Sequence, residues 1–110
     1  MLTHGTRDRT RGERLPLEWV VRKQTVDTAA LYGLGDRGTL EPGKLADCSL
    51  IGYEALRLGN PHVVADLPAG GRRLVQSATS YVETITSGVT TFAGDEDTGE
   101  RPGRLVRGAR

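Results

Sequence analysis

The spacing of hydrophobic residues predicts a helical segment that is followed by a β-rich segment. Leu17, Val20 and Val21 recur at the i, i+3, i+4 spacing of an amphipathic helix. Pro16 suits the first position of such a helix, because the N–H that proline lacks would have no partner inside the helix. The pattern therefore predicts a helix that begins near Pro16 and has one mostly apolar face.

A second, shorter helix is expected directly after the first. Thr25 or Asp27 can cap the run 28–32 by accepting hydrogen bonds from its free N–H groups. Gly33 or Gly35 would stop this helix, because glycine adopts the left-handed conformation at low cost. We therefore predict two consecutive helices that are broken between Thr25 and Asp27.

Beyond Gly38, short apolar runs separated by Pro, Gly and polar residues predict strands joined by turns. The pair Ser87-Gly88, between two β-rich runs, is a hairpin signal. Residues 93–103 carry too few apolar groups to be buried and predict a loop, and residues 105–106 are one more possible short strand. The predicted strands are residues 47–51, 63–66, 73–76, 81–86 and 89–92.

The sequence GTLEPGKLAD leads into the first predicted strand. Gly43 after Pro42 is the arrangement of a type II turn, whose third residue needs a positive φ. Ala46 is small enough for close packing, and Asp47 can accept hydrogen bonds from backbone N–H groups where the strand begins. The residues that we expect to build this turn without a catalytic role are Gly38, Pro42, Gly43, Ala46 and Asp47.

Composition indicates a loop-rich protein with a limited hydrophobic core. Hydrophobic residues make up 36% of the 110 positions, below the usual share of about 45–50%, and 15 residues are glycine. A chain of this length buries only part of the surface that it exposes when unfolded. These totals fit one small domain or a piece of a larger one.

Charge and hydropathy argue against several classes of partner. The net charge of +1 is unlike the strong basic excess of a dedicated nucleic-acid binder. The Arg-rich residues 1–14 are interleaved with acids, so we expect a solvated lead-in rather than an anion-binding arm. No apolar run approaches the roughly 18 residues of a membrane helix, and the first residues do not read as a secretory signal. We therefore expect a cytoplasmic protein with neither a nucleic-acid nor a membrane partner.

Candidate catalytic and metal-ligating residues are scattered. His4, Cys48 and His62 lack the spacing of a zinc site, and Cys48 fits a small apolar strand position. The stretch GLGDRG (33–38) follows a helix rather than a strand, so it predicts a helix stop and not a phosphate loop. The stretch PAGGRR (68–73) is expected to be a turn with solvated arginines rather than an anion nest. We predict no catalytic, cofactor-binding or metal-binding residue in this chain.

The chain resembles the C-terminal end of metal-dependent amidohydrolases, in the branch that contains N-acyl-D-amino-acid deacylases (D-aminoacylases). The stretches that carry the resemblance are RTRGERLPLEWVVRKQT, LYGLGDRGTLEPGKLADCSLIGYEAL, PAGGRRLVQ and VETITSGVTTFAGDEDTGERPGRLVRG. The resemblance implies that residues 15–35 are the last helices of a TIM barrel, after a lead-in at 1–14. It also implies that residues 36–110 form the C-terminal part of a small β-sandwich. The expected fold class is α+β, with one or two N-terminal helices followed by short antiparallel strands.

The resemblance implies a reaction that this chain does not perform by itself. The family hydrolyses non-peptide C–N bonds with a zinc-activated water, and its zinc ligands lie at the strand ends of the barrel, upstream of this chain. Gly5 stands where the family usually has a bulky aromatic residue. We therefore expect a C-terminal structural fragment, inactive alone, whose partner is the missing barrel portion or a second copy of itself. The alternative is a non-catalytic interaction or assembly module, such as a homodimer.

Overall fold

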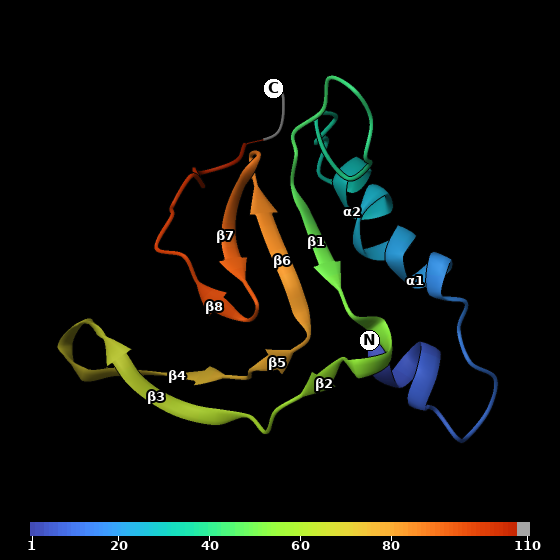
Figure 1. Ribbon diagram of the computed structural model, residues 1–110, viewed down its shortest axis with the longest axis horizontal. Helices are drawn as coiled ribbons and strands as arrows, with labels where there is room; N and C mark the ends of the chain where they lie inside the picture. The colour runs from blue at the N-terminus through green and yellow to red at the C-terminus, as the bar shows by residue number, and fades with distance from the viewer. Residues whose placement is uncertain (108–110) are drawn as a thin grey trace.

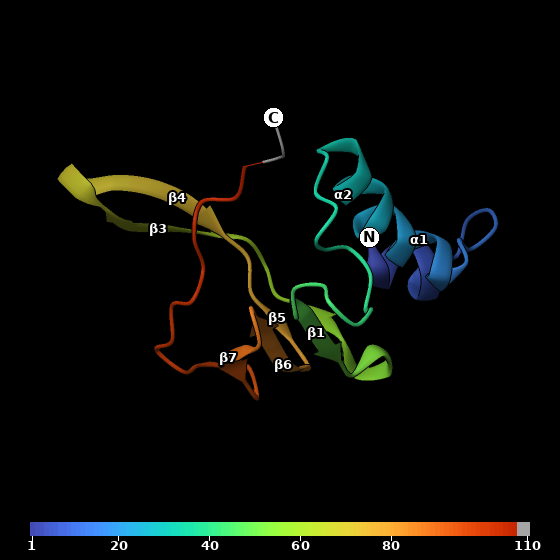
Figure 2. The same cartoon turned by 90° about the horizontal axis from the view of Figure 1, so that it is seen from above.

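The chain begins with helices and continues in antiparallel strands, as a computed structural model that describes residues 1–107 shows (Figure 1). This order confirms the predicted α+β class. The helices lie along one side of the four-stranded sheet, while a long hairpin extends from its lower end (Figures 1 and 2). The elements are therefore arranged as a curve around an open centre.

Two short α-helices follow a single turn of π-helix. The π-helical turn η1 (His4–Asp8) comes first, and α1 (Leu17–Gln24) and α2 (Val26–Leu31) follow it. Thr25 separates the two α-helices with non-helical φ and ψ angles of −118° and −93°, so the predicted break is confirmed. The lead-in is less solvated than we expected, because Thr3 and Thr6 are buried. The Thr6 hydroxyl lies 2.6 Å from the hydroxyl of Tyr53.

Helix α2 ends in a Schellman motif at the first glycine of GLGDRG. Gly33 has a φ of +68° and donates its N–H to the carbonyl of Ala30 at 3.1 Å. Leu34 donates to the carbonyl of Ala29 at 2.9 Å. This pair of bonds satisfies carbonyls that the last helical turn leaves without partners. The glycine-rich stretch is thus the predicted helix stop.

The strands of residues 1–107 form three small antiparallel sheets. The four-stranded sheet has the order β1-β6-β7-β8, whereas β2 pairs with β5 and β3 pairs with β4. Two 3₁₀ turns, η2 (Tyr53–Ala55) and η3 (Pro68–Gly70), separate some of the strands. In chain order the strands are β1 (Cys48–Ile51), β2 (Arg57–Leu58), β3 (His62–Leu67), β4 (Gly71–Val75), β5 (Ala78–Thr79), β6 (Tyr81–Thr86), β7 (Val89–Ala93) and β8 (Glu96–Asp97).

Each predicted strand is present, and the β6–β7 hairpin turns at Ser87-Gly88 as predicted. Both turn residues have positive φ, +51° and +79°, as a type I′ turn requires. The short strands β2 and β5 were not predicted, and two predictions were wrong. The predicted loop at 93–103 contains β8, and the possible strand at 105–106 is not one.

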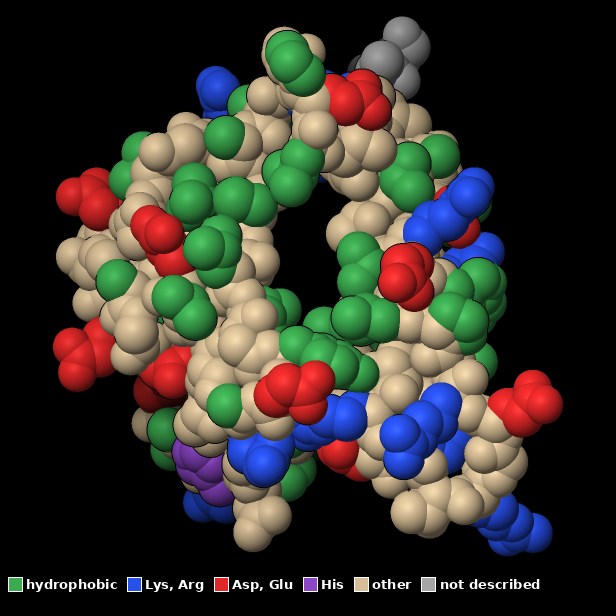
Figure 3. All heavy atoms as spheres, turned by 45° about the vertical axis from the view of Figure 1, so that its right-hand side comes forward, with side chains coloured by type: hydrophobic (Ala, Val, Ile, Leu, Met, Phe, Trp, Pro, Cys, Tyr) green, Lys and Arg blue, Asp and Glu red, His purple; other side chains and the backbone are tan. Residues whose placement is uncertain are grey.

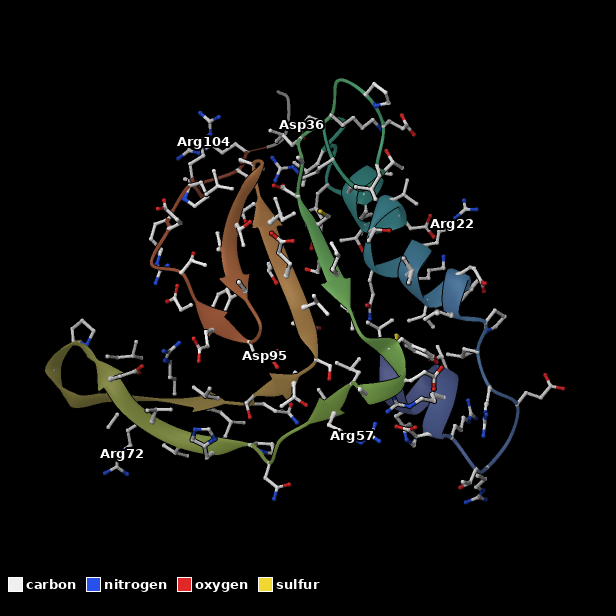
Figure 4. The ribbon with its side chains drawn as sticks, in the orientation of Figure 1. Arg22, Asp36, Arg57, Arg72, Asp95 and Arg104 are labelled. Carbon is white, nitrogen blue, oxygen red and sulfur yellow. The ribbon has the colours of Figure 1, made fainter. Side chains whose placement is uncertain are left out.

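The missed strand β8 forms through its backbone rather than through burial. Gly94 and Asp95 make a second reversal with positive φ, +58° and +68°. The Asp95 carboxylate then accepts the N–H groups of Ser80 and Tyr81 at 3.0 and 2.9 Å, beside the start of β6 (Figure 4). Because β8 consists of two exposed acidic residues, its sequence does not alternate between apolar and polar residues. The sequence pattern therefore indicated a loop.

The buried core is very small for a chain of this length. Val20, Ala29 and Leu56 are the buried apolar residues of the described chain, with 0%, 7% and 2% of their surface exposed. The radius of gyration is 16.2 Å, whereas a compact domain of this size has one of about 13 Å. Figure 3 shows an opening through the molecule with hydrophobic side chains around it. Much of the apolar surface is therefore not covered within residues 1–107.

We expect Val20→Ala to lower the free energy of unfolding by about 1–3 kcal/mol, because it removes part of a side chain that is fully buried. Val21→Ala is the matched control, since Val21 is 43% exposed and should lose less than about 0.5 kcal/mol. Urea unfolding followed by circular dichroism would measure both variants. Equal losses would contradict the placement of the core at Val20.

Candidate functional site

The turn that leads into β1 is built around the reversal at Pro42-Gly43. Lys44 donates its N–H to the carbonyl of Glu41 at 3.2 Å, and Gly43 has a φ of +89°. Both features are typical of a type II turn. The Lys44 ammonium also donates to the hydroxyl of Thr39 at 2.6 Å, which stiffens the loop on its inner side.

Gly38 holds the start of this turn against helix α2. Its φ is +90°, and a Cβ added to it would lie 2.8 Å from the Cβ of Ala29 and 3.1 Å from the Cα of Val26. Only glycine meets both conditions without strain, because it has no Cβ and accepts positive φ. The turn therefore packs on the helix through bare backbone.

Asp47 joins the end of the turn to the tip of the β6–β7 hairpin. One carboxylate oxygen accepts the backbone N–H of Ser87 at 2.8 Å, and the other accepts the Arg37 guanidinium at 3.1 Å. The neighbouring carbonyl of Ala46 accepts the N–H of Gly88 at 3.0 Å. The Ala46 side chain is exposed and does not supply the close packing that we expected. Asp47 thus orders a hairpin that lies 40 residues away along the chain.

A second tie, which the sequence analysis missed, joins the N-terminal segment to η2 through Arg7. The Arg7 guanidinium donates to the carbonyl of Tyr53, and to those of Glu54 and Leu56 at 3.0 and 2.8 Å. It also pairs with the Asp8 carboxylate at 2.6 Å and lies 5.6 Å from the centre of the Tyr53 ring. Its side chain is only 15% exposed. A single cation therefore binds several carbonyls at the end of a short helical turn.

We expect the hydrogen bonds from Arg7 to be stronger than those from a neutral donor, because the donor is charged. The carbonyls at the end of a helix also lack partners within the helix. The Thr6 hydroxyl adds a contact of 2.6 Å to the Tyr53 hydroxyl. Nothing in the sequence distinguishes Arg7 from Arg9 or Arg11, since all three alternate with polar residues. Arg7 differs from the other two arginines because the fold brings the carbonyls around η2 within hydrogen-bond distance of its guanidinium.

The carboxylates with resolved shifts are held ionised by neighbouring cations. The hydrogen bond from Arg7 holds the pKa of Asp8 below its usual range. Hydrogen bonds from Arg101 and from the backbone of Gly99 lower the pKa of Asp97 to about 2. A general acid needs a pKa near the working pH. These carboxylates are therefore suited to structural ion pairs rather than to proton transfer.

The residues considered as metal ligands do not assemble. Cys48 begins β1 and is half-buried, while His4 lies in η1 and His62 begins β3, both exposed. Within residues 1–107, no three His, Cys, Asp or Glu side chains lie close enough together to hold a metal ion. A catalytic zinc site takes three protein ligands. The described residues thus do not fit a zinc ion, and no reaction step through one is derived for this chain.

The stretch PAGGRR forms the turn of the β3–β4 hairpin. Ala69 and Gly70 have φ angles of +58° and +72°. Arg73 makes a two-point contact with the carboxylate of Asp66, at 2.8 and 2.6 Å, whereas Arg72 points away from the hairpin (Figure 4). Because Arg73 is engaged by a carboxylate, the two arginines do not converge on an anion.

The sequence of the chain matches a known protein family. A sequence model of the Amidohydrolase family matches residues 1–92, a span that runs from η1 into β7. The chain belongs to the amidohydrolase family. Searches of the curated proteins and of the solved structures each found no significant match. Within the described part of this amidohydrolase chain, no helix is both long and apolar enough to cross a membrane.

We expect Gly38→Ala to lower the free energy of unfolding by about 2–4 kcal/mol, because the new methyl meets Ala29 at 2.8 Å and the φ of +90° is unfavourable for alanine. Gly43→Ala is the matched control. It shares a positive φ but faces open space, so it should lose only about 1–2 kcal/mol. Urea unfolding of both variants tests the contact, and equal losses would show that Gly38 does not approach the helix.

We expect Arg7→Gln to lower the urea midpoint at neutral pH and to raise the pKa of Asp8 toward its ordinary value, because the hydrogen bond from Arg7 is the largest cause of the lowered pKa. A depressed carboxylate pKa stabilises the fold above the unfolded value, and this contribution is lost as the pH falls through the folded value. The difference between the parent and the variant should therefore shrink below about pH 4. Carboxyl NMR and urea titration at several pH values measure both effects.

Arg14→Gln is the control for this experiment, because Arg14 is exposed and contacts only the carbonyl of Arg9, at 3.4 Å, among the hydrogen bonds of the described chain. It should leave the pKa of Asp8 and the midpoint nearly unchanged. An Arg7→Gln variant that behaves like Arg14→Gln would rule out the tie to η2.

Proposed function

We propose that the chain is the C-terminal structural portion of an amidohydrolase of the D-aminoacylase branch. In this role it completes a β-sandwich and braces the last helices of a catalytic barrel, which hydrolyses an N-acyl amide bond. The family match over residues 1–92 supports the amidohydrolase part of the proposal. The branch and the zinc-dependent reaction stay predictions from the resemblance, and the cytoplasmic location stays a prediction from the sequence.

Two exposed apolar residues on one face of the four-stranded sheet carry the proposal. Thr84 of β6 pairs with Phe92 of β7, and Val82 lies two residues before Thr84 on the same strand. Because side chains alternate along a strand, Val82 and Phe92 share one face. They are 55% and 42% exposed. Ser49, Thr84 and Asp97 lie on the same face. A second layer, which in this proposal is the rest of the sandwich, would cover Val82 and Phe92.

The helices present apolar groups in the same way. Leu31 and Tyr32, at the end of α2, are 80% and 67% exposed, and Trp19 of α1 is 45% exposed. Last helices of a barrel would bury such groups against neighbouring helices and strands. The small core and the radius of gyration of 16.2 Å fit a unit that is completed by other structure.

The catalytic groups of the proposed enzyme would then belong to the barrel. This inference rests on the described residues alone, in which no group of three candidate ligands occurs. The Asp8 and Asp97 carboxylates are engaged by arginines, so they are not free to activate water. In this proposal the chain holds the last helices of the barrel in position.

The purified 110-residue chain, incubated with zinc and N-acetyl-D-amino acids, should release no acetate above the blank. Turnover that a chelator abolishes would overturn the structural role. The coding sequence before Met1 gives a second check, because a continuous frame that encodes a His-x-His motif would supply the barrel ligands that the proposal requires.

A homodimeric assembly module is the alternative, and the same exposed apolar groups favour it. Light scattering after size-exclusion chromatography separates the two ideas. A stable dimer whose formation is lost in Leu31→Lys or Phe92→Lys would support self-assembly. A monomer that binds a hydrophobic dye through its open sheet face would support the structural portion.

A further inference from the structure

The N-terminal segment forms the wall of a cavity that is partly open to solvent. The cavity measures about 550 Å³ and lies between η1 and the loop that leads to α1. Cavities of about 300–1,000 Å³ are typical of sites for small ligands. Its wall is fixed by two backbone bonds, from Gly5 to the carbonyl of Met1 at 2.9 Å and from Leu15 to the carbonyl of Gly5 at 3.0 Å. The loop is thereby closed at its base.

The polar side of the cavity is basic. His4, Arg9 and Arg11 line it, together with the hydroxyl-bearing Thr10, and no carboxylate side chain does. Arg9 donates its Nε–H to the carbonyl of Arg11 at 2.6 Å, which holds the two residues together. In residues 1–107 neither arginine forms an ion pair, whereas the nearby Asp8 is already engaged by Arg7. The cavity is therefore lined by two arginines whose charge is not neutralised by a described carboxylate.

The other side of the cavity is apolar, and the space there exists because residue 5 is a glycine without a side chain. The side chains of Met1 and Leu15 line it beside Gly5, which is buried. A Cβ added to Gly5 would lie 3.5 Å from Leu15 Cδ1 and 3.8 Å from Met1 Cγ, which are ordinary contact distances. A larger side chain at this position would thus extend between Leu15 and Met1. Its absence leaves an apolar space next to the arginines.

We propose that this cavity binds a small monocarboxylate that carries an aromatic or branched aliphatic group. The carboxylate lies against the guanidinium groups of Arg9 and Arg11, whose planar fork matches two carboxylate oxygens. The apolar group fills the space beside Gly5, between Met1 and Leu15. An inorganic anion would satisfy only the first half of the site, and a neutral aromatic only the second. This proposal does not depend on the structural role proposed above.

Phenylacetate is the probe, and the ¹H–¹⁵N spectrum of the full 110-residue chain is the readout. We expect saturable shifts confined to residues 1–15. Acetate, inorganic phosphate and 2-phenylethanol should each bind at least about tenfold more weakly, a difference of about 1.4 kcal/mol, because each lacks one half of the ligand. Equal binding of 2-phenylethanol would overturn the charged half, and equal binding of phosphate or acetate would overturn the apolar half.

Two variants test the two walls separately. Gly5→Leu should block the apolar space, and Arg11→Gln should remove a cation at an exposed position where the fold does not need the side chain. Each should weaken phenylacetate binding at least about fivefold, which is roughly 1 kcal/mol. Arg14→Gln, outside the cavity lining, should leave the affinity unchanged. Unchanged affinity in Arg11→Gln, or shifts spread over the strands, would refute the site even if Gly5→Leu failed to fold.

Discussion

The contact between the Arg7 guanidinium and the carbonyls around η2 is the interaction on which this structure most depends. Only Val20, Ala29 and Leu56 are buried apolar residues of the described chain, so hydrophobic burial alone gives the N-terminal segment little to hold. Arg7 binds the carbonyls of Glu54 and Leu56, some 47 and 49 residues away. A charge-assisted contact, with the Tyr53 ring beside it, therefore fixes the N-terminal segment to the strands where a larger core would otherwise do so.

The Asp47 carboxylate repeats this design at the other end of the sheet. It accepts a backbone N–H of the β6–β7 hairpin, as Arg7 donates to the backbone carbonyls near η2. Contacts to backbone groups do not depend on the identity of the contacted side chain, which leaves the strand faces free to carry apolar residues such as Phe92. Polar ties thus position the elements, while the strand faces stay exposed. This division suits a unit that completes another structure rather than one that closes on itself.

Local patterns in the sequence were enough to predict the two α-helices and the longer strands, but not the two-residue strands or the ties between elements. The helix break at Thr25, the stop at Gly33 and the Ser87-Gly88 turn each follow from a conformational preference of a few adjacent residues. Strand β8 was missed because its acidic residues bury nothing, and its pairing is purely backbone. The role of Arg7 was missed because its partners are distant in sequence. The type of residue at each turn was therefore predictable, whereas the partner of each charged side chain was not.

The π-helical turn η1 both binds the segment around η2 and lines the cavity. Thr6 and Arg7 face Tyr53 and tie the segment to the strands, while Gly5, adjacent in sequence, faces the cavity beside Leu15. A side chain at Gly5 would add apolar packing in a chain whose core is very small, and glycine also weakens a helical turn. The tie through Arg7 offsets this loss on the opposite side of the turn. The cavity can therefore persist because the segment is held by polar contacts that do not pass through it.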